Sequence, residues 1–315
     1  MSQDHGLPLV SIVIPVFNGS DYVREAIDSA LAQTWPSVEV IVVNDGSTDD
    51  TEAICLNYGD RIRYFHKKNG GQSSALNYGI TQMKGLYFSW LSHDDLYLPG
   101  KVERQVNAAS GKEDIIIYSD WMSVNAAGEP ISLTQIRDAD VSGFRYRLIT
   151  ENPYHGCSML VPAAAFRELG VFDTSIPLTS DVDLWFRFAG KYPFIHVPEV
   201  LVKGRVHSGQ VSVKKYRAHQ RESDRFYTRC LKELSDPEIM DGSGEADLRR
   251  ALAILARNFA RREYFRASTA VLRRLRKAGI SPLSLMAEKV RCRILYQKKH
   301  WKNRLKYGWL KGRFS

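Results

Sequence analysis

Two adjacent aspartates, Asp94 and Asp95, come just after the apolar run 86–91. The run is short and rich in aromatic residues, and Gly85 precedes it, so it predicts a buried strand. Paired carboxylates at the end of a buried strand are costly unless a cation or a proton shares their charge. Mg²⁺ and Mn²⁺ prefer oxygen ligands and are often held by one or two carboxylates together with substrate phosphates. The pair therefore indicates a metal site, with a helix-capping pair ahead of Pro99 as the alternative.

A third acid, Asp45, follows the run 38–43, which also predicts a strand. Open α/β sheets bind ligands at the carboxyl ends of their strands. The carboxylate of Asp45 can accept the imide N–H of a uracil ring, and Phe17, just past a strand predicted at 10–16, can stack on the base. These residues indicate a nucleotide site. The alternative is an Asp-Gly turn that binds no ligand.

A glycine-rich segment, NGGQSSALN at 69–77, precedes another predicted helix. In such a loop the backbone N–H groups can approach a phosphate, as they do at helix starts. The segment matches neither the P-loop pattern nor G-x-G-x-x-G. A plain turn between a strand and a helix is therefore the alternative.

Three residues farther along the chain can also serve a reaction. Asp181 opens a helix predicted at 181–189, where a carboxylate can face a cleft and act as a general base. Asp183 points elsewhere on that helix, so the two acids cannot do the same job, and one of them can simply cap the helix. His207 closes a strand predicted at 201–206. It is a candidate ligand for the metal or a diphosphate, with a structural histidine as the alternative.

These side chains need elements that bring them together. As far as residue 99, predicted strands and helices alternate, which predicts a mostly parallel, doubly wound α/β sheet with flanking helices. The later half is mixed, and we expect it to extend the sheet and supply the second wall of a cleft. The elements predicted in the first half are strands 10–16, 38–43, 61–66 and 86–91 and helices 23–31, 49–58 and 72–83.

The charge is divided unevenly along the chain. Between residues 249 and 315, 20 Lys and Arg stand against Glu263 and Glu288, a net charge of +18. The whole chain carries +9, so the remainder carries −9. Opposite charges indicate two functional regions, which we place at 1–215 and 216–315.

Composition bounds the cellular setting. The absence of any apolar run of about 18 residues predicts no membrane span, and the first residues lack the pattern of a signal peptide. The four cysteines are far apart in sequence, which suits a reducing compartment and argues against a zinc site or a disulfide framework. We expect a cytoplasmic protein, with peripheral attachment to the inner face of the plasma membrane as a further option.

In their order, these motifs resemble those of family 2 inverting glycosyltransferases. The resemblance covers about residues 8–215 and implies a GT-A fold, a nucleotide-sugar donor and a divalent metal, Mg²⁺ or Mn²⁺. It rests on VSIVIPVFN at 10–18, IVVNDGSTD at 41–49, the glycine-rich segment, SHDD at 92–95, Ser180-Asp181 with Leu184-Trp185, and Arg205-Val-His207.

The resemblance also implies a role for each matching residue. Ser92 departs from the family by standing where the first aspartate of its DxD pattern is usual, and Ser180 replaces a glutamate that often precedes the base. The implied residues are Pro15, Phe17 and Asp45 for the base pocket, Asn69, Gly71 and Asn77 for the donor site, Asp94, Asp95 and His207 for the metal, and Asp181 for the catalytic base.

The implied reaction is transfer of a sugar, with inversion, from a UDP-sugar to a hydroxyl of a glycan or lipid-linked acceptor in cell-surface polysaccharide biosynthesis. A polyprenyl-phosphate sugar synthase is an alternative within the fold, although a phosphate nucleophile needs no base such as Asp181. An alternative of another class is a basic nucleic-acid-binding protein. The acidic body and the lack of an aromatic-rich RNA motif count against it, so we expect no nucleic acid partner.

Beyond residue 214 the pattern is almost entirely helical, and we predict a hinge in the polar stretch 235–245. The last segment, 282–315, mixes apolar residues with many bases. Such a helix can lie in a membrane interface, with its bases on anionic lipid heads; the alternative is a helix that packs on the body and has a solvated basic face. The apolar residues at helical spacing are Leu283, Met286, Val290, Ile294, Trp301 and Leu305.

Overall fold

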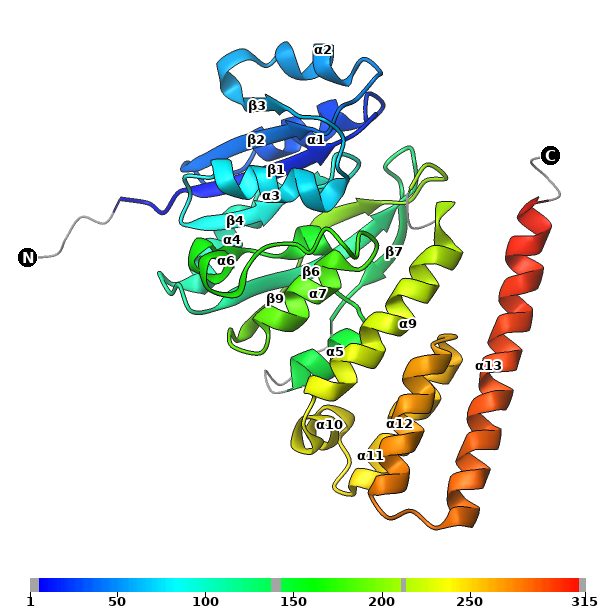
Figure 1. Cartoon of the computed structure of the whole chain (residues 1–315). Coiled ribbons are helices and arrows are strands. Elements are labelled where there is room, and N and C mark those ends of the chain that lie inside the picture. Colours follow the sequence, from blue (N-terminus) through cyan, green and yellow to red (C-terminus); the bar gives the residue numbers. More distant parts are fainter. Residues whose placement is uncertain (1–5, 137–142, 211–213, 312–315) are drawn as a thin grey trace, which may run out of the picture. The chain divides into compact units, whose positions relative to one another are not determined.

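The computed structural model describes residues 6–136, 143–210 and 214–311 (Figure 1). Tertiary contacts divide these residues into two compact units. The first unit contains residues 6–136 and 153–210, and the second contains residues 143–152 and 214–311. The short segment 143–152 thus belongs with the C-terminal helices rather than with its neighbours in sequence.

The main sheet of the first unit has five strands in the order β3-β2-β1-β4-β8 (Figure 1). All but β8 run parallel to their neighbours. Every residue of β1 is buried, as expected for a β-branched strand covered on both faces. The strands are β1 (Val10–Val16), β2 (Val38–Asn44), β3 (Arg63–His66), β4 (Tyr87–Trp90) and β8 (Val161–Pro162).

Three helices connect the parallel strands, as the alternating pattern predicts. They are α1 (Val23–Leu31), α2 (Thr51–Leu56) and α3 (Gln72–Gln82). Helix α3 packs on β1 and β2. Gly79 lets α3 come close, because a Cβ atom there would lie 2.3 Å from Val13 Cγ1.

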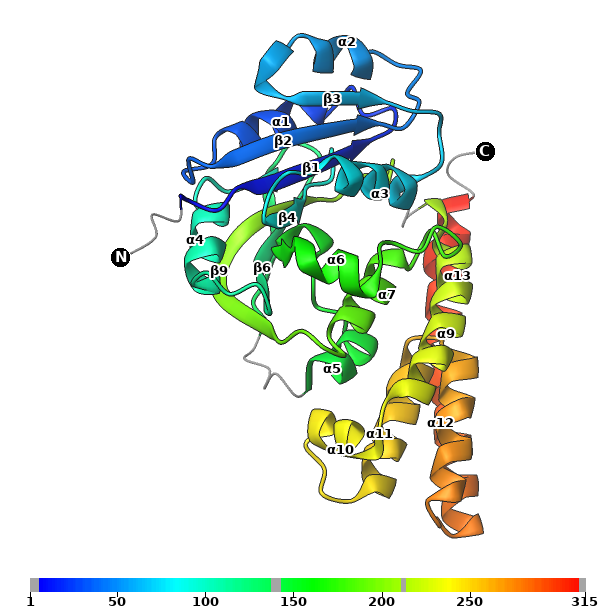
Figure 2. The same cartoon turned by 60° about the vertical axis from the view of Figure 1, so that its left-hand side comes forward.

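The second half of the first unit builds its own sheet, in the order β5-β9-β6-β7. Strands β6 and β9 run side by side and parallel (Figure 2). Strands β5 and β7 pair antiparallel with them and form the edges of this sheet. The expected extension of the main sheet is therefore limited to the two residues of β8. The remaining elements of this half are β5 (Leu96–Tyr97), α4 (Lys101–Ala109), β6 (Ile116–Val124), β7 (Pro130–Thr134), α6 (Ala163–Leu169), α7 (Ser180–Phe188) and β9 (Phe194–Arg205).

The second unit is helical in its described residues. The predicted hinge at 235–245 is wrong, because residues Asp236–Ser243 form helix α10. Ser235 and Glu238 cap it reciprocally, so the polar residues serve a helix start rather than a flexible joint. The helices are α5 (Phe144–Thr150), α9 (Tyr216–Glu233), α10, α11 (Leu248–Arg261), α12 (Phe265–Lys277) and α13 (Pro282–Lys311).

Helices α11, α12 and α13 pack on one another. The break between α12 and α13 lies at Gly279 and Pro282. Among the described residues, none of the helices has a stretch both long and apolar enough to cross a lipid bilayer.

Candidate functional site

The predicted site residues gather at the carboxyl edge of the main sheet. Strands β2, β1 and β4 are parallel neighbours, so their last residues, Asn44, Val16 and Trp90, lie at the same edge. Asp45 follows β2, Phe17 follows β1, and Asp94 follows β4 within four residues. This edge is where an open α/β sheet binds its ligands.

The carboxylate of Asp45 organises the glycine-rich loop. It is buried and accepts the backbone N–H groups of Gly70, at 3.0 and 3.1 Å, and Gly71, at 2.7 Å. Lys67 Nζ lies 2.5 Å from Asp45 Oδ1. Gly46 has a φ of +78°, and a Cβ atom there would lie 2.9 Å from the backbone nitrogen of Asn69. Only glycine fits this turn without strain, since the loop crosses directly over it.

The loop after β1 contacts both the loop after β2 and the segment after β4. Asn18 N donates to Ser47 Oγ at 2.9 Å, and Gly19 N donates to Thr51 Oγ1 at 2.9 Å. On the other side, a Cβ atom on Gly19 would lie 2.4 Å from the ring of His93. The nucleotide residues and the aspartate pair are therefore neighbours across this loop.

The remaining residues predicted to bind the nucleotide lie around this edge and differ in their exposure to solvent. Pro15 is buried in β1 opposite Val43, whereas the ring of Phe17 is about half exposed and offers a face for stacking. Asn69 is exposed, and Gly71 begins α3 with a φ of +86°.

The side chain of Asn77 is already hydrogen-bonded within the protein. Its Nδ2 donates to Phe172 O at 2.8 Å and its Oδ1 accepts Phe172 N–H at 3.0 Å. Both ends of the amide thus hold α3 to the segment ahead of α7. A direct contact between Asn77 and a donor stays a prediction, and the structure adds this clamp to it.

Asp181 lies in the first turn of α7 and is partly exposed. The preceding residue, Ser180, shares a buried hydrogen bond of 2.7 Å with Ser73 in the first turn of α3. The N-termini of α3 and α7 are thereby joined, which brings Asp181 to the glycine-rich loop. Asp183 is buried and accepts a hydrogen bond from Arg187 Nε at 2.9 Å, so it serves the helix.

Asp94 and His207 form a pair although 113 residues separate them. Asp94 Oδ2 and His207 Nε2 are 3.0 Å apart, and both side chains keep some exposure. Burial opposes ionisation of Asp94, but the charge of His93 and the hydrogen bond with His207 outweigh it and lower the pKa of this carboxyl. The ring of His207 rests against Tyr22, with centroids 5.1 Å apart.

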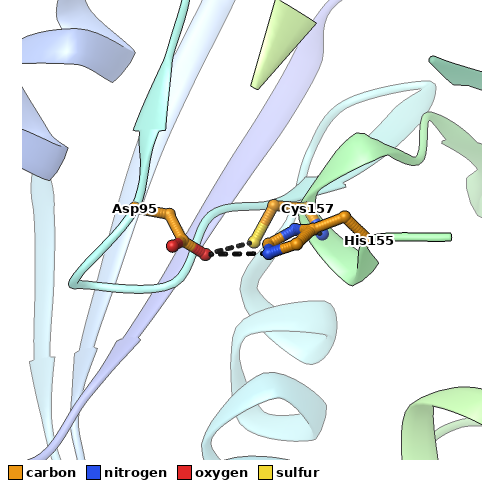
Figure 3. Close-up of side chains that lie close together, drawn as sticks. All are labelled: Asp95, His155 and Cys157. Carbon is orange, nitrogen blue, oxygen red and sulfur yellow. Dashed lines mark hydrogen bonds and ion pairs between the residues drawn. The ribbon is translucent and has the colours of Figure 1, made fainter. Parts of the chain in front are cut away.

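Asp95 turns the other way, into the protein. Its Oδ1 accepts the backbone N–H of Arg205 at 2.9 Å, and its Oδ2 accepts the thiol of Cys157 at 3.3 Å (Figure 3). The ring of His155 lies 3.7 Å from the same oxygen. Burial raises the pKa of Asp95 above its usual value, and the charge of Asp94 adds to the effect. The two adjacent aspartates therefore have opposite environments.

Two groups of side chains can be tested as a cation site. Two neighbouring ligands of an octahedral ion, each bonded at about 2.1 Å, lie about 3.0 Å apart. Asp94 and His207 have this separation and partial exposure, so they fit a cation that also binds donor phosphates.

The second group is Asp95, His155 and Cys157, whose ligand atoms lie within 4.8 Å of one another (Figure 3). It fits such a cation less well. Asp95 and Cys157 are buried, and burial raises the pKa of the thiol far above its usual range, so it stays protonated. We therefore interpret this group as a support for the aspartate pair.

The contacts of Arg205 were not predicted from the sequence. It is buried, and its Nε donates to Asp94 O at 3.0 Å. Its guanidinium also lies over the ring of Tyr22, 4.5 Å from the centroid, and reaches Glu25 at 2.8 Å. Arg205 thus ties the aspartate loop to β9, and its one sequence signal is its place two residues before His207.

Ser92 is likewise explained by its contacts. Its backbone N–H donates to Cys157 Sγ at 3.2 Å, and its hydroxyl lies 3.5 Å from the same sulfur. Cys157 therefore joins Ser92 to Asp95. Since these partners are more than 60 residues apart, no local spacing could reveal them.

Comparison with known protein families identifies the family of the chain. A model of glycosyl transferase family 2 matches residues 11–172. An uncharacterised glycosyltransferase of Rickettsia felis is 47% identical over 262 residues; the match covers 80% of this chain and 43% of that protein, so the chain spans less than half of its length. Chondroitin synthase of Pasteurella multocida is 32% identical, over 68% of this chain and 22% of the synthase.

Solved structures resemble the fold, and two of them serve as examples. Residues 1–349 of TarS from S. aureus, in complex with UDP, has a TM-score of 0.61 at 14% identity, with 95% of this chain and 92% of that one covered. The mannosyltransferase PcManGT from Pyrobaculum calidifontis, in complex with GDP-Man and Mn²⁺, has a TM-score of 0.57 at 16% identity, with 96% and 85% covered. These likenesses confirm the GT-A fold class predicted from the sequence.

Proposed function

Because this chain belongs to glycosyl transferase family 2, we propose that it transfers a sugar from a nucleotide-diphosphate donor to a hydroxyl of a glycan or lipid-linked acceptor. The observation that carries the proposal is the pairing of Asp94 with His207 at the sheet edge that also holds Asp45 and its glycine-rich loop. A metal-bound diphosphate and a nucleoside need these two kinds of site side by side.

The donor is a UDP-sugar in this proposal. One support is Asp45. Its carboxylate can accept the imide N–H of a uracil ring once Lys67 or the glycine-rich loop gives up its hydrogen bond to the same carboxylate. A second support is the exposed ring of Phe17, which can stack on the base. The structure of TarS with UDP-GlcNAc concerns a protein of the same fold. Donor specificity is part of the proposal, since the likeness to PcManGT concerns a GDP-sugar enzyme.

In the proposed reaction, Asp181 accepts the proton of the acceptor hydroxyl, and the oxygen attacks the anomeric carbon of the sugar from the face opposite the diphosphate. The bond from that carbon to the diphosphate breaks, so the configuration inverts. Asp94 and His207 would hold the cation, Mg²⁺ or Mn²⁺. When bound, the cation supplies Lewis-acid stabilisation of the charge on the departing nucleoside diphosphate.

Two supports hold this arrangement. Asp95 and Arg205 fix the backbone around Asp94, and the bond between Ser73 and Ser180 fixes Asp181 relative to the loop. We place the reaction in cell-surface polysaccharide biosynthesis, in the cytoplasm at the inner face of the plasma membrane. The similarity to a chondroitin synthase supports a polysaccharide product.

The first test is a panel of nucleotide sugars incubated with the protein and Mn²⁺, with the products identified by mass. With Mn²⁺ we expect hydrolysis or transfer of a UDP-sugar. Without the metal we expect every nucleotide sugar of the panel to stay intact. A panel in which no nucleotide sugar binds or turns over would contradict the proposal.

The second test concerns the metal ligands. Titration with UDP in the presence of Mn²⁺ is expected to show affinity lower by more than about tenfold in Asp94→Ala and His207→Ala, because each loses a ligand of the cation. The matched control is His300→Ala in the second unit, an exposed histidine that bonds Glu263 at 2.8 Å. Unchanged UDP affinity in both site variants would refute the metal assignment.

A further inference from the structure

Helix α13 has two apolar faces, and only one of them is packed within the second unit. Leu285, Glu288 and Cys292 are buried against the neighbouring helices α11 and α12. Farther along, Asn303 donates to the hydroxyl of Tyr216 at 2.9 Å, so the helix stays attached over several turns. Helix α13 therefore packs within its own unit, and it does so through these residues rather than through the apolar residues singled out in the sequence.

The second face is an exposed apolar stripe. At 100° per residue its members lie within about 80° of one another and on the opposite side from Cys292. Their exposed fractions range from 47% to 81%. The first and last members lie 18 positions apart, which is about 27 Å along the helix. The stripe consists of Leu283, Met286, Val290, Ile294 and Trp301.

Basic side chains line both sides of the stripe. In helical projection Arg291, Lys298 and Lys302 lie along one side, and Lys289 and Arg293 along the other. All five are exposed. The one acid in α13, Glu288, is buried and bonded to Arg291 at 2.6 Å. No exposed acid therefore offsets these bases on the described side chains of α13.

We propose that this stripe docks on an anionic lipid surface, with α13 lying in the plane of the interface. The apolar side chains enter the boundary between headgroups and acyl chains, the flanking bases meet anionic headgroups, and Trp301 sits at the polar boundary. Because the opposite face of α13 packs on α11 and α12, the rest of the second unit lies on the side of α13 that faces away from the lipid.

The charge of the flanking side chains favours an anionic lipid surface over two other partners, a second copy of the chain and a nucleic acid. A second copy of the chain docked through the same stripe would bring two rows of bases together, which is unfavourable. A nucleic acid would neutralise the bases but leave the apolar side chains in water. A flat anionic surface satisfies both features over the whole length of the stripe.

The experiment is flotation of the full chain with vesicles, one set of phosphatidylcholine alone and one containing about 30% phosphatidylglycerol to supply the anionic charge. The wild-type protein is expected to float with the anionic vesicles and much less with the neutral ones. Val290→Asp/Ile294→Asp should partition about tenfold less, because two apolar anchors are replaced by charges that the lipid repels.

The matched control is Ile131→Asp/Leu133→Asp on β7. These residues are exposed to a similar degree, 56% and 51% against 50% and 47% for Val290 and Ile294, and the change in net charge is the same. The control variant is expected to float like the wild type. Circular dichroism on each variant checks that the helices are intact, which is expected since all four positions are exposed.

The proposal is overturned if the wild type does not float with anionic vesicles, or if both double variants float equally. It is also overturned if light scattering shows a wild-type dimer that Val290→Asp/Ile294→Asp converts to a monomer without changing flotation, since the stripe would then serve a second copy. The assay contains no donor, so its outcome is independent of the proposed transfer reaction.

Discussion

Two neighbouring residues of one type, Asp94 and Asp95, have opposite environments, and this difference suits them to different functions. Asp94 is held by His207 at the open edge, and its pKa is lowered despite burial, whereas burial raises the pKa of Asp95. A carboxylate that stays ionised and accessible suits a cation. A covered carboxyl that bonds Arg205 and Cys157 suits a support. In the proposed site, the adjacent positions would therefore supply one metal ligand and one buried support.

The base assignment is tested by Asp181→Asn. The amide keeps the size of the side chain but cannot accept the acceptor proton at neutral pH, so turnover should fall by about 10²–10⁴ while UDP affinity changes little. Steady-state rates and a UDP titration measure the two effects. The control, Asp183→Asn, is expected to keep turnover and lower the melting temperature, because it weakens the contact with Arg187. If Asp181→Asn retained most of its activity, another group would have to be the base.

A buried lysine predicts a specific pH dependence of stability. Lys101 is fully covered, donates to Ser89 Oγ at 2.6 Å, and lies 4.2 Å from the ring centroid of Tyr97. Burial lowers the pKa of Lys101 to about 7. The unfolded chain, with a pKa near the ordinary value, therefore binds a proton that the folded chain lacks between about pH 7 and 10.

The free energy of unfolding should accordingly rise with pH through this window, by on the order of 1 kcal/mol per pH unit from this one group. Lys101→Met removes that contribution, and the exposed control Lys84→Met keeps it. Chemical denaturation at several pH values gives the slopes. Equal slopes for the wild type and Lys101→Met would show that Lys101 titrates normally in the folded protein.

At the scale of elements, short contacts between loops and helix ends bring the site together. The loop after β2 lies under the glycine-rich loop through Gly46, and α3 and α7 meet at Ser73 and Ser180. The first approach joins two loops, and the second joins the first turns of two helices. The proposed donor site therefore depends on a few close approaches that tolerate no added atoms.

Gly46→Ala tests the closest of these approaches. The new Cβ would press on the backbone of Asn69, and the positive φ adds strain, so stability should fall by about 1 kcal/mol or more and UDP affinity should fall with it. Gly59→Ala is the matched control, because Gly59 also has a positive φ, +52°, but open space around it. Thermal unfolding and UDP titration separate the strain from the displaced loop. If Gly46→Ala and Gly59→Ala both lost UDP affinity, backbone strain alone would explain the loss, and displacement of the loop at Asn69 would not be needed.

At the scale of the whole molecule, opposite charges along the chain govern what it can bind. The segment 249–315 carries +18, while the residues before it carry −9. A uniformly basic protein would attract polyanions over its surface, but an acidic body repels them. The basic segment also contains the apolar stripe of α13, which a polyanion cannot cover.

We therefore predict weak binding to nucleic acid. In a mobility-shift experiment, any complex with a DNA or RNA oligonucleotide at low salt should be lost at about 0.15 M salt, because only a few phosphate contacts from the basic helices would hold it. Vesicle binding through the stripe should persist better at that salt, since it includes an apolar part. Tight oligonucleotide binding that survives at this salt would favour the nucleic-acid alternative.

The fold class and the family were predictable from sequence because both depend on local patterns. Alternating apolar runs and helical periodicity mark β1, β2, β3 and β4 and the helices between them, and their order matches the structure closely. The motifs around Asp45, Asp94 and Asp181 are short and lie at strand and helix ends, where local sequence is informative. The roles of these residues in transfer stay predictions until the variants are measured.

Other features depended on tertiary structure because their partners are far apart in sequence or equivalent in pattern. The contacts of Arg205 and Cys157 with the aspartate pair span 110 and 62 residues, and no spacing rule connects such positions. Polarity alone indicated a hinge at 235–245, whereas a capping box makes this segment a helix. Apolar residues occur on both faces of α13, so periodicity predicts the helix but only packing decides which face is left exposed.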